Sequence, residues 1–234
     1  MKHLIEAEDL SGLTRVDYNR IILDSDTDDI IVRRGGEGNP NGYPYVDLGL
    51  PSGLKWATMN VGATSETEKG DYFMWGSTTA NTAKECTWTN APFNGGASSC
   101  DEAYFTDHKS KWLDDNDNLK PEYDAARVNM GGDWRMPTEA EFQELLDKTT
   151  HEWTTINGVK GRKFTSKTDT SKYIFIPAAG DFYYGSSYNV GGVHIWGSSK
   201  ISSIEYASCL TSDSSSYYMS VAPRCRGLSV RGVL

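Results

Sequence analysis

Residues 131–146 read GGDWRMPTEAEFQELL, and this stretch decides the fold more than any other part of the chain. Pro137 fixes the backbone where a helix begins, and Thr138 is a residue type that caps helices. Glu141 follows Thr138 by three positions, which is the spacing of a capping box. The sequence therefore predicts a helix over 138–148. Its apolar residues recur at helical spacing and predict one buried face: Ala140, Phe142, Leu145 and Leu146.

The segments on either side of this helix are short and are separated by turn residues. A weaker helix is expected at 123–128, and residues 76–120 are polar without clear periodicity, which predicts a long loop. Short strands rich in aromatic and β-branched residues are expected on both sides. They are two strands within 46–56 around a Pro-Ser-Gly turn, then 71–75, 161–165, 173–176, 205–210, 217–221 and 228–233. This pattern predicts an α+β domain with one or two helices and mostly short antiparallel strands, preceded by a small β-hairpin.

The first 42 residues differ in composition from the rest. Two short β-branched runs, 18–24 and 29–33, flank an acidic turn, so residues 1–34 are expected to form a β-hairpin for attachment or oligomerisation. The segment GGEGNPNG at 35–42 is typical of a linker. The remainder, 43–234, is expected to be a single ligand-binding domain.

Charge and hydropathy exclude several classes of partner. The chain has 234 residues and a formal net charge of −9, so it should repel nucleic acid. Its N-terminal sequence lacks the apolar run of a signal peptide, and no stretch approaches 18 apolar residues. We therefore expect neither a signal peptide nor a transmembrane segment in this chain, and no membrane insertion.

The sequence offers no established catalytic or metal-binding motif. HExxH spacing, a GxSxG elbow and phosphate-binding glycine loops are absent. Two acidic runs, 24–29 and 114–117, carry oxygen ligands that calcium accepts, but neither has EF-hand spacing, so solvated turns are the expected interpretation. No cofactor is expected. The four cysteines, in any of three pairings or as free thiols, are Cys86, Cys100, Cys209 and Cys225.

Several motifs of the chain together resemble the Fib-succ-major paralogous domain family. They are VDLGLPSGLKWA (46–57), NVGA (60–63), GDYFMWG (70–76), YDAARVNMGGDWRMPTEAEFQELL (123–146), NGVKG (157–161), IFIPAAG (174–180), WGSS (196–199) and GLSVR (227–231). The resemblance covers about 43–234. It implies a C-type-lectin-like fold related to formylglycine-generating enzymes. The copper-dependent cysteine pair of those enzymes has no counterpart in spacing here, which argues against their oxidase activity.

The C-terminal tract 196–231 resembles the variable region of diversity-generating retroelement proteins. The resemblance lies in Trp196, Ser198, Ser199, Gly227, Ser229, Val230 and Arg231, with Leu228 where the family has Phe. It implies a diversified binding surface, and serine and tyrosine are typical of such surfaces. The expected ligand-binding residues are His194, Ile195, Ile201, Ser203, Ile204, Tyr206, Ser208, Thr211, Asp213, Tyr217, Tyr218, Ser220 and Arg224. Strand alternation should place Tyr217 and Tyr218 on opposite faces.

These features favour a non-enzymatic receptor-binding protein on a phage particle or cell surface. Its expected partner is a surface protein or glycan of a host or neighbouring cell, and trimers would raise affinity through avidity. One alternative is an adhesin module of a fimbria-like or lipoprotein system. The other is a formylglycine-generating-like oxidase.

Overall fold

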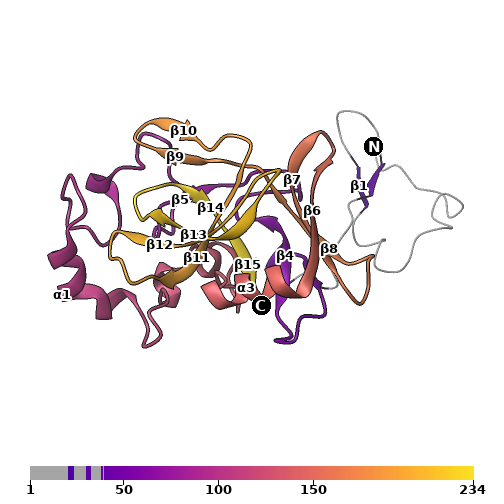
Figure 1. Cartoon of the computed structure of the whole chain (residues 1–234), viewed down its shortest axis with the longest axis horizontal. Coiled ribbons are helices and arrows are strands. Elements are labelled where there is room, and N and C mark those ends of the chain that lie inside the picture. The colour runs from indigo at the N-terminus through magenta and orange to yellow at the C-terminus, as the bar shows by residue number, and fades with distance from the viewer. Residues whose placement is uncertain (1–20, 24–29, 33–37, 39) are drawn as a thin grey trace, which may run out of the picture.

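The computed structural model describes residues 21–23, 30–32, 38 and 40–234, and this part of the chain forms five β-sheets and three α-helices (Figure 1). The mixture confirms the α+β class. The helices are α1 (Glu102–Trp112), α2 (Ala125–Met130) and α3 (Glu139–Lys148). Short 3₁₀ helices cover Pro40–Gly42, Trp88–Asn90 and Pro121–Tyr123.

The largest sheet has the strand order β13-β12-β11-β14-β5. Its bounds are β5 Tyr72–Phe73, β11 Val193–Lys200, β12 Tyr206–Ser212, β13 Tyr217–Pro223 and β14 Leu228–Ser229. Strands β11, β12 and β13 form an antiparallel meander, whereas β14 runs parallel to β11. The tract 196–231 therefore forms most of this sheet, and β13 is its edge strand.

Two three-stranded sheets and two hairpins complete the strands. One sheet has the order β15-β4-β3 and the other β6-β7-β8. Their bounds are β3 Tyr45–Asp47, β4 Lys55–Asn60, β15 Arg231–Val233, β6 Thr149–Ile156, β7 Val159–Ser166 and β8 Tyr173–Pro177. The hairpins are β1 (Ile21–Leu23) with β2 (Ile30–Val32), and β9 (Asp181–Tyr183) with β10 (Ser186–Tyr188).

The predicted helix at 138–148 is confirmed, including its capping box. The Thr138 side chain accepts a hydrogen bond from the Glu141 backbone N–H, and the Glu141 carboxylate accepts one from Thr138 N–H at 2.8 Å. Glu141 also forms an ion pair with Arg135, with 2.5 Å between Nη2 and Oε1. Phe142, Leu145 and Leu146 are buried as predicted, but Ala140 is exposed, so the apolar face is narrower than expected.

The expectation of an unbroken loop over 76–120 is wrong, because helix α1 lies within it. Asp101 caps this helix by accepting a hydrogen bond from Tyr104 N–H at 2.8 Å. The helix is mostly polar and buries only Phe105 and Trp112. It therefore lacks the regular apolar stripe that would reveal a helix in the sequence.

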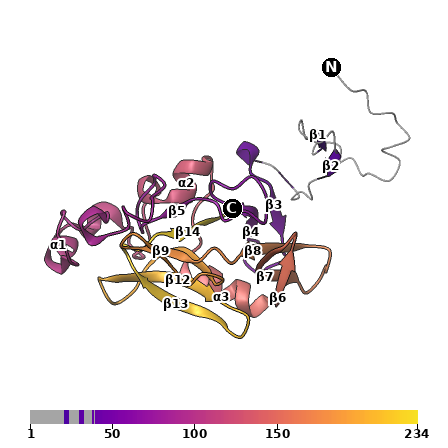
Figure 2. The same ribbon diagram turned by 90° about the horizontal axis from the view of Figure 1, so that it is seen from above.

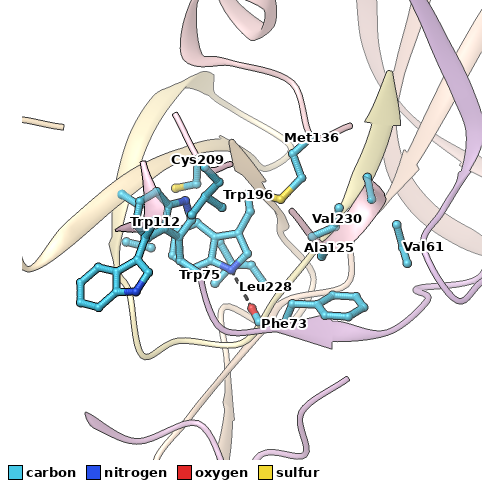
Figure 3. Close-up of a cluster of buried hydrophobic side chains, with 14 of the residues drawn as sticks. Val61, Phe73, Trp75, Trp112, Ala125, Met136, Trp196, Cys209, Leu228 and Val230 are labelled. Atoms are coloured by element: carbon cyan, nitrogen blue, oxygen red, sulfur yellow. Dashed lines mark hydrogen bonds between the residues drawn. The ribbon is translucent and has the colours of Figure 1, made fainter. Parts of the chain in front are cut away.

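Tryptophan side chains organise the main core beneath the five-stranded sheet (Figure 3). Trp196 is fully buried, and its indole Nε1 donates to the Phe73 carbonyl at 2.7 Å. The indole of Trp75 donates to the Gly197 carbonyl at 3.0 Å. Because both indole N–H groups have carbonyl partners, these large side chains are buried without losing a hydrogen bond. They fix β11 against β5.

In the described part of the predicted N-terminal hairpin, Ile21 pairs with Val32 and Leu23 with Ile30. The other residues of 1–34, and 35–37 and 39 of the expected linker, lie outside the described residues. The end of that linker contacts the domain. The Pro40 carbonyl accepts from the Trp134 indole at 3.3 Å, and Asn41 donates to the Met130 carbonyl at 3.2 Å.

None of the helices in the described ranges has the length and hydrophobicity needed to cross a membrane.

Candidate ligand-binding groove

A cavity of about 490 Å³ lies between the β11-β12-β13 meander and the segment around β9 and β10. We call it the groove and define it by Asp181, Asn189, Val190, His194, Thr211, Tyr218, Ser220 and Arg226. Its volume lies within the range of roughly 300–1,000 Å³ that is usual for small-molecule pockets. Asp181 on β9, Thr211 on β12 and Tyr218 on β13 all line it, and Figure 2 shows these strands close together.

Strand register places the groove side chains on one face of the meander. His194 on β11 pairs with Thr211 on β12, and Thr211 pairs with Tyr218 on β13. In the next row on that face, Cys209 pairs with Ser220. Because side chains alternate along a strand, all five face the same side. The meander therefore presents hydroxyl, imidazole and phenol groups in neighbouring positions.

A buried charge network forms the opposite wall of the groove. Arg226 Nη1 donates to Asp181 Oδ1 at 2.9 Å and to Oδ2 at 3.0 Å. Asn189 Nδ2 donates to Asp181 Oδ2 at 2.6 Å, and Nδ1 of His194 lies 3.6 Å from the same oxygen. The Asp181 side chain is only 1% exposed. Such a carboxylate needs several donors to be stable in the interior, and here the network supplies them.

Burial lowers the pKa of His194; the nearby Asp181 carboxylate opposes this change, and the Arg226 guanidinium adds to it. At neutral pH the imidazole is therefore uncharged, and one ring nitrogen can donate while the other accepts. The groove thus offers a neutral polar group at the position where β11 meets β9.

Cys209, His194 and Asp181 all line the groove, so a thiol nucleophile was considered. The Cys209 sulfur lies 3.7 Å from the Thr211 hydroxyl, and burial raises the pKa of its thiol to about 12. A nucleophilic cysteine needs a depressed pKa, because the thiolate is the reactive form. This geometry gives Cys209 the properties of a buried structural thiol.

The turn between β12 and β13 closes one end of the groove. The Asp213 carboxylate accepts hydrogen bonds from Ser215 N–H at 2.7 Å and Ser216 N–H at 2.8 Å. Arg162 on β7 donates through Nη2 to the Asp213 carbonyl at 2.6 Å and through Nε to the Ser212 hydroxyl at 2.9 Å. The turn is therefore held from within and from the neighbouring sheet.

Exposed apolar side chains are concentrated on β13 and on the segment 184–190, the two stretches that border the groove. Of the described residues, seven large hydrophobic ones are exposed, and six belong to β13 or to the segment 184–190 that includes β10. The six are Tyr184, Tyr188, Val190, Tyr217, Tyr218 and Val221. Val190 and Tyr218 are 76% and 50% exposed, and both line the groove. An exposed apolar cluster with a polar centre is typical of an interaction site.

The structure brings five of the thirteen predicted residues to the groove: His194, Thr211, Asp213, Tyr218 and Ser220. Four others lie on the connection from β11 to β12 or at the start of β12, and do not line it: Ile201, Ser203, Ile204 and Tyr206. Tyr217 lies on the opposite face, as alternation predicted, with its ring 3.9 Å from that of His151.

Three predicted contact residues are corrected because their side chains are buried: Ile195, Ser208 and Arg224. Ile195 packs in a second hydrophobic cluster, on the face of the sheet opposite the groove. Ser208 donates to the Ser199 carbonyl at 3.0 Å. The Arg224 guanidinium lies over the Phe105 ring at 4.2 Å and donates to the Ile204 carbonyl at 2.6 Å. These side chains support the sheet from inside and do not reach a ligand.

Sequence reasoning missed the wall opposite the meander. Asp181 and Asn189 lie before the tract 196–231. Arg226 lies within it but was not among the predicted ligand-binding residues. The turn residues NVGG at 189–192 and the tyrosines of 183–188 were the available signals. They indicate a turn and an exposed aromatic segment, but not which strands face them.

The four cysteines are free thiols. Cys86 and Cys225 share one buried cluster, against which Cys100 packs, whereas Cys209 lies in another. Among the described residues, no group of three His, Cys, Asp or Glu side chains is placed to hold a metal ion. Asp114 instead accepts hydrogen bonds from Asn116 and Asn118 N–H, both at 2.9 Å. The acidic run 24–29 lies outside the described residues.

Comparison of the chain with family models, curated proteins and solved structures gave no match. Its functional assignment therefore depends on the geometry of the groove and on the motifs in its sequence.

Proposed function

We propose that the chain is a non-enzymatic receptor-binding protein that holds its ligand in the groove. In this proposal its domain has the C-type-lectin-like fold and belongs with the Fib-succ-major and retroelement-diversified proteins. The protein is displayed on a phage particle or cell surface, and its partner is a molecule on the surface of another cell.

The observation that carries the proposal is the position of the exposed apolar side chains. Val190 and Tyr218 line the groove, while Tyr188 lies on β10, next to the groove residue Asn189. Exposing such side chains to water is unfavourable, and burying them against a partner releases that cost. Tyrosine is frequent among the residues that dominate binding energy at interfaces.

Rigid support of the groove also favours recognition. The face of the meander that backs the groove packs on a hydrophobic cluster through Ile195 and Leu210, and Arg162 holds its terminal turn. A preorganised surface loses less conformational entropy when a partner binds. Side chains on such a surface can change while the buried frame remains constant. This is the arrangement that a diversified tract requires.

The chemistry of the groove favours binding over catalysis. Its thiol has a pKa raised to about 12, its imidazole is neutral, and its buried carboxylate is engaged by Arg226 and Asn189. Each of these groups has a structural partner within the protein. A hydrogen-bonding ligand can use the remaining hydroxyl and amide groups without a covalent step.

The proposal is tested by labelling the protein with a fluorescent dye and measuring its binding to a panel of intact bacterial and animal cells. We expect at least one cell type to bind, and Tyr218→Ala and Val190→Ser to weaken that binding about tenfold. Val128→Ser is the matched control, because Val128 is 51% exposed on α2 and does not line the groove. Loss of binding in the control, or unchanged binding in both groove variants, would refute the proposal.

A further inference from the structure

We infer that the groove binds a neutral saccharide and needs no metal ion to do so. This inference deepens the proposed function and rests on it. It follows from three features of the groove: the buried ion pair in its wall is closed, the hydroxyl and imidazole groups of its floor are neutral, and an exposed phenol ring stands beside them.

The first feature is the closed ion pair at the groove wall. Asp181 receives Nη1 of Arg226 and Nδ2 of Asn189, so its two oxygens already have donors. The Arg226 guanidinium lies 4.7 Å from the centre of the Tyr183 ring and 5.4 Å from that of Tyr188. It is thus stabilised by a carboxylate and by aromatic faces. An anionic ligand would have to compete with Asp181 for this cation.

The second carboxylate of the groove is also engaged. Asp213 accepts from the N–H groups of Ser215 and Ser216 and from the Ser215 hydroxyl at 2.8 Å. These bonds lower its pKa to about 2. All three bonds end on Oδ1 and hold the carboxylate in the turn. The charge that this end of the groove presents is negative, which disfavours an anionic ligand.

The remaining polar groups can both donate and accept. Thr211 and Ser220 contribute hydroxyls on adjacent strands, and His194 contributes a neutral imidazole. Tyr218 contributes a half-exposed phenol in the same row as Thr211. Sugar hydroxyls also donate and accept, so such groups satisfy them in either direction. A purely apolar ligand would leave them unpaired, which is costly.

The aromatic and aliphatic rim matches the other face of a sugar ring. A pyranose presents hydroxyls at its edge and C–H groups on its faces. Tyr218 combines an apolar ring with a polar tip, and Val190 extends the apolar side of the rim. A sugar held edge-on by Thr211 and Ser220 could pack a C–H face against Tyr218.

An array of neutral, sialylated and sulfated oligosaccharides tests this inference when it is probed with the full chain, once in EDTA and once in calcium. We expect binding to at least one neutral glycan, with the same strength in both conditions. Tyr218→Ala and Thr211→Val should each weaken it about tenfold, and Tyr218→Phe less. The Val128→Ser control should bind like the original protein. Binding to no neutral glycan, or only to charged ones, would overturn the inference.

Treating the cells with periodate or with protease distinguishes a failure of this inference from a failure of the proposed function. On the cells that bind the protein, periodate destroys sugar diols and protease removes surface proteins. We expect periodate to abolish binding that depends on Tyr218. If protease abolishes that binding and periodate does not, the partner is a protein: the saccharide inference fails while the proposed function stands. If the binding is insensitive to both groove variants, both fail.

Discussion

Arg226 reaches back 45 positions in the sequence to place its Nη1 atom 2.9 Å from Oδ1 of Asp181. This pair joins the C-terminal tract to the β9–β10 hairpin. Figure 1 shows that hairpin above the meander. Phe182 on β9 and Gly227 also exchange two backbone hydrogen bonds, each at 2.9 Å. The ion pair and this backbone bridge therefore hold the wall of the groove against the C-terminal tract.

The losses in the free energy of unfolding caused by replacing Asp181 and Arg226 should not be additive. Asp181→Leu leaves the mostly buried Arg226 cation without its carboxylate, so we expect a loss of about 3 kcal/mol in the free energy of unfolding. Arg226→Met should cost a similar amount. The double variant Asp181→Leu/Arg226→Met should lose clearly less than the sum. Urea unfolding measures all three, and additive losses would show that the pair is not coupled.

Two adjacent tyrosines should differ in their effect on stability. The Tyr217 ring lies 3.9 Å from His151 and 5.1 Å from the Arg162 guanidinium, so Tyr217→Ala should cost about 1 kcal/mol. Tyr218 projects to the other face, and Tyr218→Ala should change stability by less than about 0.5 kcal/mol. Thermal unfolding of the two variants checks this order. The reverse order would mean that the faces of β13 are wrongly assigned.

The thiols should react with DTNB in a defined order. Burial raises the pKa of Cys86, Cys209 and Cys225 to about 12, so they should stay protonated and react slowly in the folded protein. Cys100 is partly exposed and should react first. Four equal fast reactions under native conditions would contradict the burial of the other three. Unfolding in guanidinium should release all four.

Acid should weaken the β12–β13 turn through Asp213. Its pKa is lowered from 3.8 to about 2 because the folded state donates hydrogen bonds to its carboxylate. A depressed folded pKa gives stability that is present above 3.8 and is lost as pH falls toward 2. Asp213→Asn should therefore be less stable than the original protein at pH 6 but equal to it near pH 2. A constant difference across that range would argue against these hydrogen bonds.

The elements predicted best from the sequence were those with local signals. The helix at 138–148 was found because Thr138 and Glu141 form a capping box within a few residues. The two strands within 46–56 were predicted because a Pro-Ser-Gly turn separates them, and Val46 pairs with Trp56 in the structure. Such features depend on neighbours in the chain, so a single sequence is enough to show them.

The features missed depend on contacts between distant segments. Helix α1 is polar and is held by Phe105 and Trp112, which pack with Phe93. Composition alone could not tell that Ser208 and Arg224 face the interior, because serine and arginine are usually exposed. The same holds for the groove, where Asp181 and Arg226 meet only after the chain folds.

Hydroxyl-radical footprinting of the protein bound to intact cells tests the central claim most directly, because side-chain oxidation reports solvent exposure without knowledge of the ligand. The groove account predicts that binding protects Tyr218 and Val190, both exposed in the free protein, and leaves Val128 unchanged. Protection of Val128 with full oxidation of Tyr218 and Val190 would place the partner elsewhere and contradict the account.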